Sequence, residues 1–173
     1  MKKLWALALV ALFLTGCGGE KSLETITDVQ DTPVVSTTQQ ILVQLPPELS
    51  TPALQNSENG TLYMCEDYSL VIQTVESGDL ARTIQNATGM KKEDLQIVQT
   101  QQGSAKRYQW VWTANGETGA QIGRGCVLDD GAYHYVITAL VDEALAKEVQ
   151  PVWKEIFASF RLTPEKEPIN TGS

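Results

Sequence analysis

The feature that most constrains the fold is a stretch of three strand-like segments joined by two tight turns. The segments are residues 106–114, 120–128 and 132–141, and the turns are Asn115-Gly116 and Asp129-Asp130-Gly131. In the first segment aromatic and polar side chains alternate, which is typical of a strand with one face in a core. Because strands joined by short hairpins pair antiparallel, this stretch predicts an antiparallel sheet.

The preceding residues add further strands and a short helix. Four strands are predicted at residues 41–45, 61–65, 69–76 and 95–100. Asp79 is a good N-cap for a helix that extends to about Thr88 and is closed by Gly89. Within the hairpin region, Gly123 and Gly125 are expected to soften their strand and to make a bulge.

The C-terminal part carries the longest amphipathic pattern. Apolar side chains recur at helical spacing over residues 142–159, and Pro151 is expected to kink or split this helix or to start a second helical segment. Residues 160–162 could add a short strand. The expected fold is therefore α+β, an antiparallel sheet of about six to seven strands with a short helix and a long C-terminal helix packed on it.

The first residues have the pattern of a secretory signal. A basic start is followed by an 11-residue apolar run that ends at Leu14, and Cys17 comes directly after small residues. The sequence Leu14-Thr15-Gly16-Cys17 resembles the lipobox of bacterial lipoproteins. The resemblance implies that residues 1–16 are cleaved off as a signal peptide. It also implies that Cys17 becomes the lipidated N-terminus, with a diacylglycerol thioether and palmitate-type chains.

Such an anchor predicts a location at the extracytoplasmic face of a cell membrane, since two or three acyl chains hold a protein firmly. The apolar run would be roughly 16 Å long as a helix, about half a bilayer core, which argues against a permanent transmembrane helix. A non-lipidated signal cut nearby is the other alternative. Gly18 follows the modified cysteine, which favours the outer membrane if the source has two membranes.

The rest of the chain divides by composition. Residues 17–40 are expected to form the lipidated cysteine and a disordered tether, residues 41–164 a single α+β domain, and residues 165–173 a polar tail. The mature chain keeps all 21 acidic residues and 11 of the 13 basic ones, a formal net charge of −10. This charge argues against nucleic acid as a partner and against adhesion to anionic lipid headgroups.

Two cysteines remain once Cys17 is acylated. In an exported setting Cys65 and Cys126 could form a disulfide, which would close a loop of roughly 60 residues and contribute about 4 kcal/mol. The alternative is a pair of small thiols buried on core strands. The sequence leaves both alternatives open.

The C-terminal third carries a second resemblance. A strand such as AYHYVITALV, followed by a helix ending VWKEIFASFRL, resembles the C-terminal signature of PsbP-like domains. That group includes the DcrB-type bacterial lipoproteins and a Ran-binding nuclear import factor. The similarity covers roughly residues 41–163, and its sharpest part is Ile156 to Leu162. It implies a fold whose members are mostly non-catalytic assembly or binding modules.

Catalytic and cofactor motifs are not found in the sequence. His134 is the only histidine and is predicted mid-strand, on the face opposite the neighbouring tyrosines. The sequence has no Gly-x-Ser-x-Gly nucleophile elbow with which a catalytic histidine could act. One histidine and two separated cysteines cannot form a zinc site without carboxylates, and Asp129-Asp130 and Glu66-Asp67 lack the spacing of a calcium loop. We therefore expect no enzyme activity, no cofactor and no metal site.

Five aromatic residues form the candidate binding surface: Tyr108, Trp110, Trp112, Tyr133 and Tyr135. In one interpretation they line the sheet face under the C-terminal helix and pack on Trp153 and on Phe157 or Phe160. In the other, some of them form an exposed platform for a peptide, a glycan or a partner protein.

These observations give a leading hypothesis and two alternatives. The leading hypothesis is a lipid-anchored, non-catalytic cell-envelope lipoprotein that acts as a binding or assembly module with an envelope protein partner. The first alternative is a small-ligand or substrate-binding lipoprotein associated with a transporter. The second is an envelope hydrolase, which would need a polar pocket holding His134 or a pair of carboxylates.

Overall fold

A computed structural model describes residues 38–56, 60–116 and 119–163, all within the compact unit Thr37–Ser173. The predicted signal peptide, the lipidation site Cys17, most of the tether and the polar tail lie outside the described residues.

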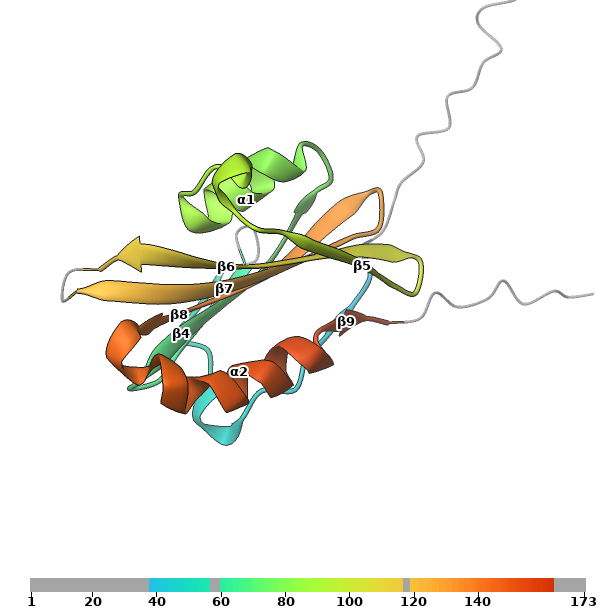
Figure 1. Cartoon of the computed structure of the whole chain (residues 1–173). Helices are drawn as coiled ribbons and strands as arrows, with labels where there is room; N and C mark the ends of the chain where they lie inside the picture. The colour runs from blue at the N-terminus through green and yellow to red at the C-terminus, as the bar shows by residue number, and fades with distance from the viewer. Residues whose placement is uncertain (1–37, 57–59, 117–118, 164–173) are drawn as a thin grey trace, which may run out of the picture. The chain divides into compact units, whose positions relative to one another are not determined.

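Seven strands form one antiparallel sheet in the order β2-β3-β4-β8-β7-β6-β5 (Figure 1). Their bounds are Leu54–Asn56 for β2, Gly60–Met64 for β3, Tyr68–Glu76 for β4, Val98–Gln102 for β5, Ala105–Asn115 for β6, Ala120–Asp129 for β7 and Tyr133–Asp142 for β8. The predicted hairpins β6–β7 and β7–β8 both form. The predicted antiparallel α+β fold is confirmed.

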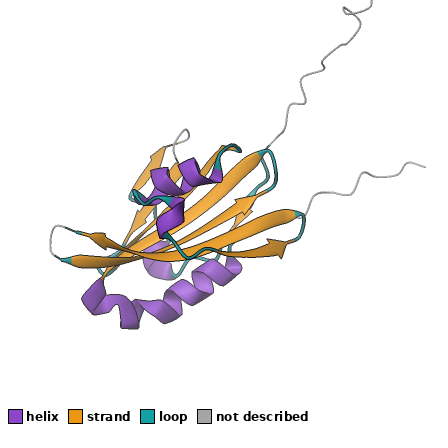
Figure 2. Ribbon diagram, turned by 45° about the horizontal axis from the view of Figure 1, so that its top comes forward, coloured by secondary structure: helices purple, strands orange, loops and turns teal. Residues whose placement is uncertain are grey.

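Two helices lie on opposite faces of the sheet (Figures 1 and 2). Helix α1 (Leu80–Thr88) begins at Asp79, whose side chain accepts a hydrogen bond from the Ala81 amide at 2.9 Å, and ends at Gly89 with φ of 74°. Helix α2 (Ala146–Ser159) follows a short 3-10 turn and continues through Pro151. Pro151 therefore neither splits the helix nor starts a second one.

The ends of the described unit are held together by a separate pair of short strands. β1 (Ile41–Leu42) pairs antiparallel with β9 (Arg161–Leu162), and the Thr163 amide donates to the carbonyl of Gln40 at 2.9 Å. The strand predicted at residues 41–45 is thus shorter than expected. Before β1, the Gln39 amide donates to the hydroxyl of Tyr135 at 2.8 Å.

Two boundaries on the sheet edges differ from prediction. β2 falls between two predicted strands, where the sequence predicts none, and β5 begins at Val98, three residues later than the predicted strand. The turn into β6, where Gly103 has φ of 60°, sets the register of β5 by pairing Gln102 with Ala105. A 3-10 turn, Lys92–Asp94, takes up part of the preceding chain.

The bulge expected at Gly123 and Gly125 does not form, because pairing of β6 with β7 is unbroken from Lys106 to Asn115. The glycines are needed for a different reason. A Cβ at Gly123 would lie 2.3 Å from the ring of Trp112, and one at Gly125 would lie 2.3 Å from the ring of Trp110. Each indole therefore lies flat on the glycine opposite it in the neighbouring strand.

The core has two parts, one on each face of the sheet. The α1 face holds Ile84, Trp110, Trp112, Val127 and Val136. The α2 face holds the larger cluster, whose members come from α2 and the residue after it, from alternate positions of β4, β7 and β8, from Ala105 of β6 and from Leu49. Successive residues of β6 thus pack into two different clusters, one on each face of the sheet.

Candidate functional site: a groove beside the C-terminal helix

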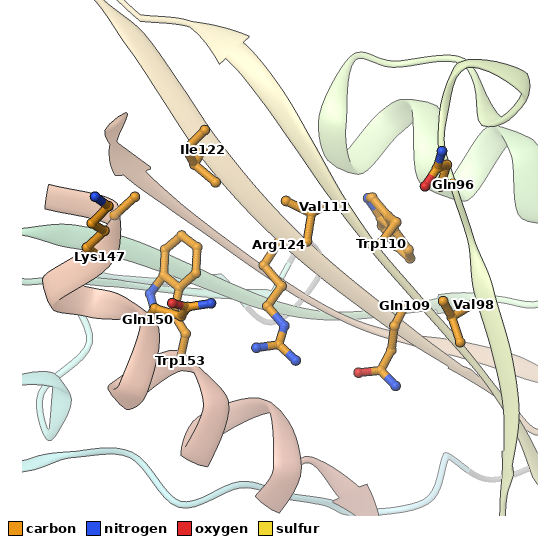
Figure 3. A pocket seen from close by; sticks show the side chains of 11 residues that line it. Gln96, Val98, Gln109, Trp110, Val111, Ile122, Arg124, Lys147, Gln150 and Trp153 are labelled. Carbon is orange, nitrogen blue, oxygen red and sulfur yellow. The ribbon is translucent and has the colours of Figure 1, made fainter. Parts of the chain in front are cut away.

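A groove of about 710 Å³ lies on the α2 face, between the first half of α2 and strands β5, β6 and β7 (Figure 3). Its apolar and aromatic lining consists of Val98, Trp110, Val111, Ile122, Ala146 and Trp153. Its polar lining consists of Gln96, Gln109, Arg124, Lys147 and Gln150. This volume and this mixture are typical of small-molecule sites.

The groove exists because α2 covers only part of its face. Along β6 the side chains that face α2 are buried at Ala105 and Arg107, half-buried at Gln109, and exposed at Val111 and Thr113. Helix α2 packs against β8, which leaves the β5 and β6 side of the sheet uncovered near the β6–β7 turn. The exposed valines of this side form the open wall of the groove.

Arg124 is the central charged group of the groove. In Figure 3 its side chain projects from β7 on the same side as Gln109, toward the level of α2. Its guanidinium lies 4.7 Å from the ring centroid of Phe157, a cation–π contact. Burial lowers its pKa, and the nearby Arg107 cation lowers it too, while Cys126 opposes the shift. Within the described residues the side chain of Arg124 makes no hydrogen bond or ion pair.

Arg107, on the same face, is in the opposite situation. It is buried, and its guanidinium donates to the carbonyls of Phe157 and Phe160 and to the Gln102 side chain. These carbonyls end α2, where the helix has no intrahelical donors left for them. Arg107 therefore holds the C-terminal end of the helix on the sheet, whereas the donors of Arg124 stay free for a ligand.

Trp153 forms the wall that α2 contributes. It is 5% exposed and packs edge-on against Tyr68, with ring centroids 6.3 Å apart. Among the described residues, the indole N–H of Trp153 and that of Trp110 are buried without a hydrogen-bond partner. A buried donor without a partner costs about 1 to 3 kcal/mol, so both tryptophans carry a local penalty.

The structure divides the five aromatic residues of the predicted binding surface between the two faces. Tyr108, Trp110 and Trp112 pack on the α1 face, whereas Tyr133 and Tyr135 pack in the α2-face core. The prediction that all five line the face under the C-terminal helix is therefore wrong for the first three. Period-two alternation shows which residues of one strand share a face, but it does not say which face receives which helix.

These residues also do not form one exposed platform. Both tryptophans and Tyr135 are buried, while Tyr108 and Tyr133 are half-buried. The Tyr135 hydroxyl donates to the Asp130 carboxylate at 2.9 Å, and burial raises the pKa of Tyr135 to about 12. Asp130 also accepts from the amides of Ala132 and Tyr133, so this network fixes the β7–β8 turn.

His134 lies on the α1 face, away from the groove. It is 1% exposed, its Nδ1 is 2.7 Å from the Thr83 hydroxyl, and its Nε2 is 3.4 Å from the Ser77 hydroxyl. Asp129 approaches the same Nε2 at 3.9 Å. Burial lowers the pKa of His134, with Asp129, Asp130 and Asp79 opposing the shift. A carboxylate that orients a catalytic histidine would sit at the nitrogen that Thr83 occupies here.

The two cysteines of the sequence hypothesis are free thiols. Cys65 follows β3, and Cys126 lies on β7, with β4 and β8 between these strands. Three strand spacings separate them by about 14 Å, whereas a disulfide needs Cα atoms within about 7 Å. Cys126 is fully buried, which raises its pKa to about 12. The structure therefore agrees with the alternative in which the two thiols are not bridged.

Two further properties concern metal binding and membrane crossing. In residues 38–56, 60–116 and 119–163 no three His, Cys, Asp or Glu side chains gather where they could hold a metal ion. No helix in these ranges has the length and apolar character needed to cross a membrane.

Sequence reasoning missed the groove and its cation. Arg124 stands between two glycines in an otherwise apolar strand, AQIGRGCVL, and a charge at such a position is a signal that could have pointed to it. Val111 carried no signal of its own, because its exposure depends on where α2 crosses the sheet.

No family model matches the chain, and no curated protein matches it. Solved structures share its fold. A protein of Bacteroides thetaiotaomicron is 14% identical with a TM-score of 0.50, over 73% of this chain and 46% of that one. LpqN of Mycobacterium tuberculosis, involved in cell envelope biogenesis, is 10% identical with a TM-score of 0.49, over 73% and 85%. PsbP (CyanoP) of Synechocystis is 9% identical with a TM-score of 0.46, over 78% and 99%. At these identities the likeness concerns the fold alone.

Proposed function

We propose that this protein is a lipid-anchored, non-catalytic cell-envelope module that binds a ligand in the groove beside α2. The observation that carries the proposal is the groove, whose volume of about 710 Å³ lies within the range of small-molecule sites, roughly 300–1,000 Å³. Between the two binding hypotheses, this favours capture of a small ligand over docking of a protein partner.

The anchoring part of the proposal is supported by the sequence. The lipobox-like Leu14-Thr15-Gly16-Cys17 follows a basic and an apolar segment, which together are typical of an exported lipoprotein. Replacing Cys17 with Ala removes the thiol that receives the lipid. We expect the Cys17→Ala form to leave the membrane fraction after cell breakage, while the native form stays there; equal membrane retention of both would contradict the anchor.

The non-catalytic part is supported by the surroundings of His134. Its ring is almost fully buried, and both nitrogens face side chains, with Thr83 at the position that would orient a general base. The groove lies on the other face of the sheet, so a ligand in the groove does not reach this histidine.

The groove is tested by photo-crosslinking in living cells. A benzophenone amino acid replaces Val111 in the groove and, as a matched control, Leu54 on the opposite sheet edge; the two positions are 60% and 62% exposed. After irradiation, the intact mass of the purified protein is measured. We expect a recurrent small-molecule adduct at position 111 and none at position 54.

Other results of this experiment separate the hypotheses. Equal labelling at both positions, or none at position 111, overturns the groove as the binding site. A recurrent adduct of protein mass at position 111 transfers the function to the assembly hypothesis, in which the groove receives an envelope protein.

A further inference from the structure

The charges around the groove are unlike those of the rest of the chain. The chain has 21 acidic and 13 basic residues. None of the residues that line the groove is acidic, whereas Arg124 and Lys147 are both basic. Because cations and no carboxylate line the groove, it favours an anionic ligand. The negative charge of the rest of the protein disfavours binding of the same anion elsewhere on the surface.

The guanidinium of Arg124 is poised to receive such an anion. Its contact with the Phe157 ring, 4.7 Å from the guanidinium to the ring centroid, gives the N–H donors no oxygen or nitrogen acceptor. Those donors have no acceptor within the part of the chain that the structure describes. A carboxylate or phosphate matches this fork of donors in a bidentate manner.

Beside the cation lies an unusually exposed apolar wall. Val98 and Val111 are each 60% exposed, and both point to the α2 face, where Val98 is paired with Gln109 and Val111 with Arg124. Covering such side chains contributes about 25 cal/mol for each Å² of apolar surface removed from water. The wall therefore favours a ligand with an apolar part next to its anionic group.

The sheet face under the groove favours an acyl chain over a peptide. β6 pairs with β7 from Lys106 to Asn115, but with β5 only from Ala105 to Gln109. On the face itself a peptide backbone would find side-chain amides alone to satisfy its own groups, which is costly in a partly apolar site. An acyl chain makes no such demand. A peptide would have to pair at the outer edge of β6 beyond Gln109, and the hexapeptide competition described below tests for it.

We infer that the ligand is an amphipathic anion whose carboxylate or phosphate headgroup binds Arg124 and whose apolar chain covers Val98, Val111 and Trp153. This inference rests on the proposed function, because it names the ligand class of the same groove. It requires no covalent step, and it makes Arg124 the residue that decides specificity.

The test uses the mature, lipidated protein in nanodiscs of phosphatidylcholine. The probes are 12-bromododecanoate and its uncharged methyl ester, whose bromine quenches nearby tryptophan fluorescence. Trp153 and Trp110 both line the groove, whereas Trp112 packs on the other face. The Trp153→Phe variant therefore separates the signal of Trp153 from that of Trp110, and we expect this replacement to remove most of the quenching. We expect the acid to bind at least tenfold more tightly than the ester, which corresponds to about 1.4 kcal/mol.

Val111 provides a matched pair of variants. Because Val111 is directly opposite Arg124 in the β6–β7 register, the carboxylate introduced by Val111→Glu would occupy the guanidinium itself. Val111→Gln has the same size without the charge. The position is exposed, so both variants should fold. We expect Val111→Glu and Arg124→Gln to weaken acid binding at least tenfold, and Val111→Gln and Leu54→Glu to change it less than twofold.

The outcomes distinguish the inference from the proposed function. If acid and ester bind equally and Val111→Glu changes nothing, the groove binds ligands but the anionic class is wrong. If inorganic phosphate displaces the probe as well as dodecyl phosphate does, the ligand is a free anion and the apolar part is wrong. If an acidic apolar hexapeptide alone displaces it, the ligand is a peptide. If neither probe quenches Trp153, the inference fails, and the crosslinking result alone decides whether the groove binds anything.

Discussion

The side chains on the two faces of strand β6 are buried in different ways. On the α1 face the indole rings of Trp110 and Trp112 lie on Gly125 and Gly123, so the strands themselves fill the space. On the α2 face the side chains are smaller or charged, and burial depends on the helix above them. Where the helix ends its coverage, Val111 is left exposed.

The difference shows how a groove can arise without any loss of sheet regularity. Large rings packed on glycines close a face locally, and Ile84 of α1 packs in the same cluster. A face covered by a helix is closed only along the line of the helix, and α2 packs mainly along β8. The β5–β6 side of that face stays open, and Arg124 occupies the boundary between the covered and the open part.

The largest expected effect comes from adding bulk to the closed face. Gly125→Val would place a Cβ 2.3 Å from the Trp110 ring, and we expect the free energy of unfolding to fall by about 3 kcal/mol or more, measured by urea denaturation. Val111→Leu on the open face should change it by less than about 0.5 kcal/mol. Gly78→Val is the control, since a Cβ there has no atom within 4 Å. Equal costs at positions 125 and 111 would remove the distinction between the two faces.

The next effect compares two arginines on the α2 face. Arg107→Met removes hydrogen bonds to the carbonyls of Phe157 and Phe160, and we expect a loss of about 2 to 3 kcal/mol in stability. Arg124→Met removes a cation–π contact with Phe157, worth about 1 kcal/mol or less. Thermal unfolding followed by circular dichroism measures both. A larger loss at Arg124 would mean that it is a structural residue rather than a free ligand group.

Much of this arrangement follows from local sequence signals. The hairpin turns, the alternation in residues 106–114, and the Asp79 and Gly89 caps predict the sheet and α1 because each depends on neighbours in the chain. The role of Gly125 could not be predicted in this way, since it depends on which residue of β6 lies opposite. For the same reason, alternation grouped Trp110 and Trp112 on one face correctly but could not show that this face packs on α1.

The candidate site was less predictable than the fold. A groove is defined by where a helix stops covering a sheet, and nothing local to Val111 or Val98 encodes the path of α2. The distance between Cys65 and Cys126 likewise depends on strand order, which places β4 and β8 between their strands. Only the charge of Arg124 within an apolar strand was visible in advance.

A third prediction concerns pH and the adjacent residues His134 and Tyr135, which belong to opposite faces. Burial lowers the pKa of His134. Below about pH 6.5, His134 therefore binds a proton in the unfolded chain but not in the native state. Stability should therefore fall as the pH falls from 7 to 5, by at most about 1.4 kcal/mol per pH unit. Urea midpoints should show this slope in the native protein and a flatter one in His134→Gln. The same slope in both would assign the acid sensitivity to other groups.

Stability at alkaline pH should depend on groups of the α2 face. The pKa of Tyr135 is raised to about 12 and that of Cys126 to about 12, both mainly by burial. Above the ordinary pKa values of these groups, the unfolded chain loses protons that the native state keeps, so stability should decline as the pH rises beyond about 9. Cys126→Ser, measured against the native protein between pH 8 and 11, should reduce that decline; an unchanged decline would leave Tyr135 and Tyr68 as its cause.

The smallest expected effect compares the two tryptophans whose indole N–H groups are buried without a partner. Replacing either with Phe removes that penalty, which offsets part of the lost apolar contact. On the closed face, Trp110→Phe leaves a gap above Gly125 that neighbouring strands cannot fill, and we expect a net loss of about 1 kcal/mol. On the groove side, Trp153→Phe should cost less than about 0.5 kcal/mol, because its surroundings border open space and can relax. Urea denaturation of both variants resolves this difference, and a cost at Trp153 equal to that at Trp110 would mean that the groove wall is packed as tightly as the closed face and cannot adjust to a ligand.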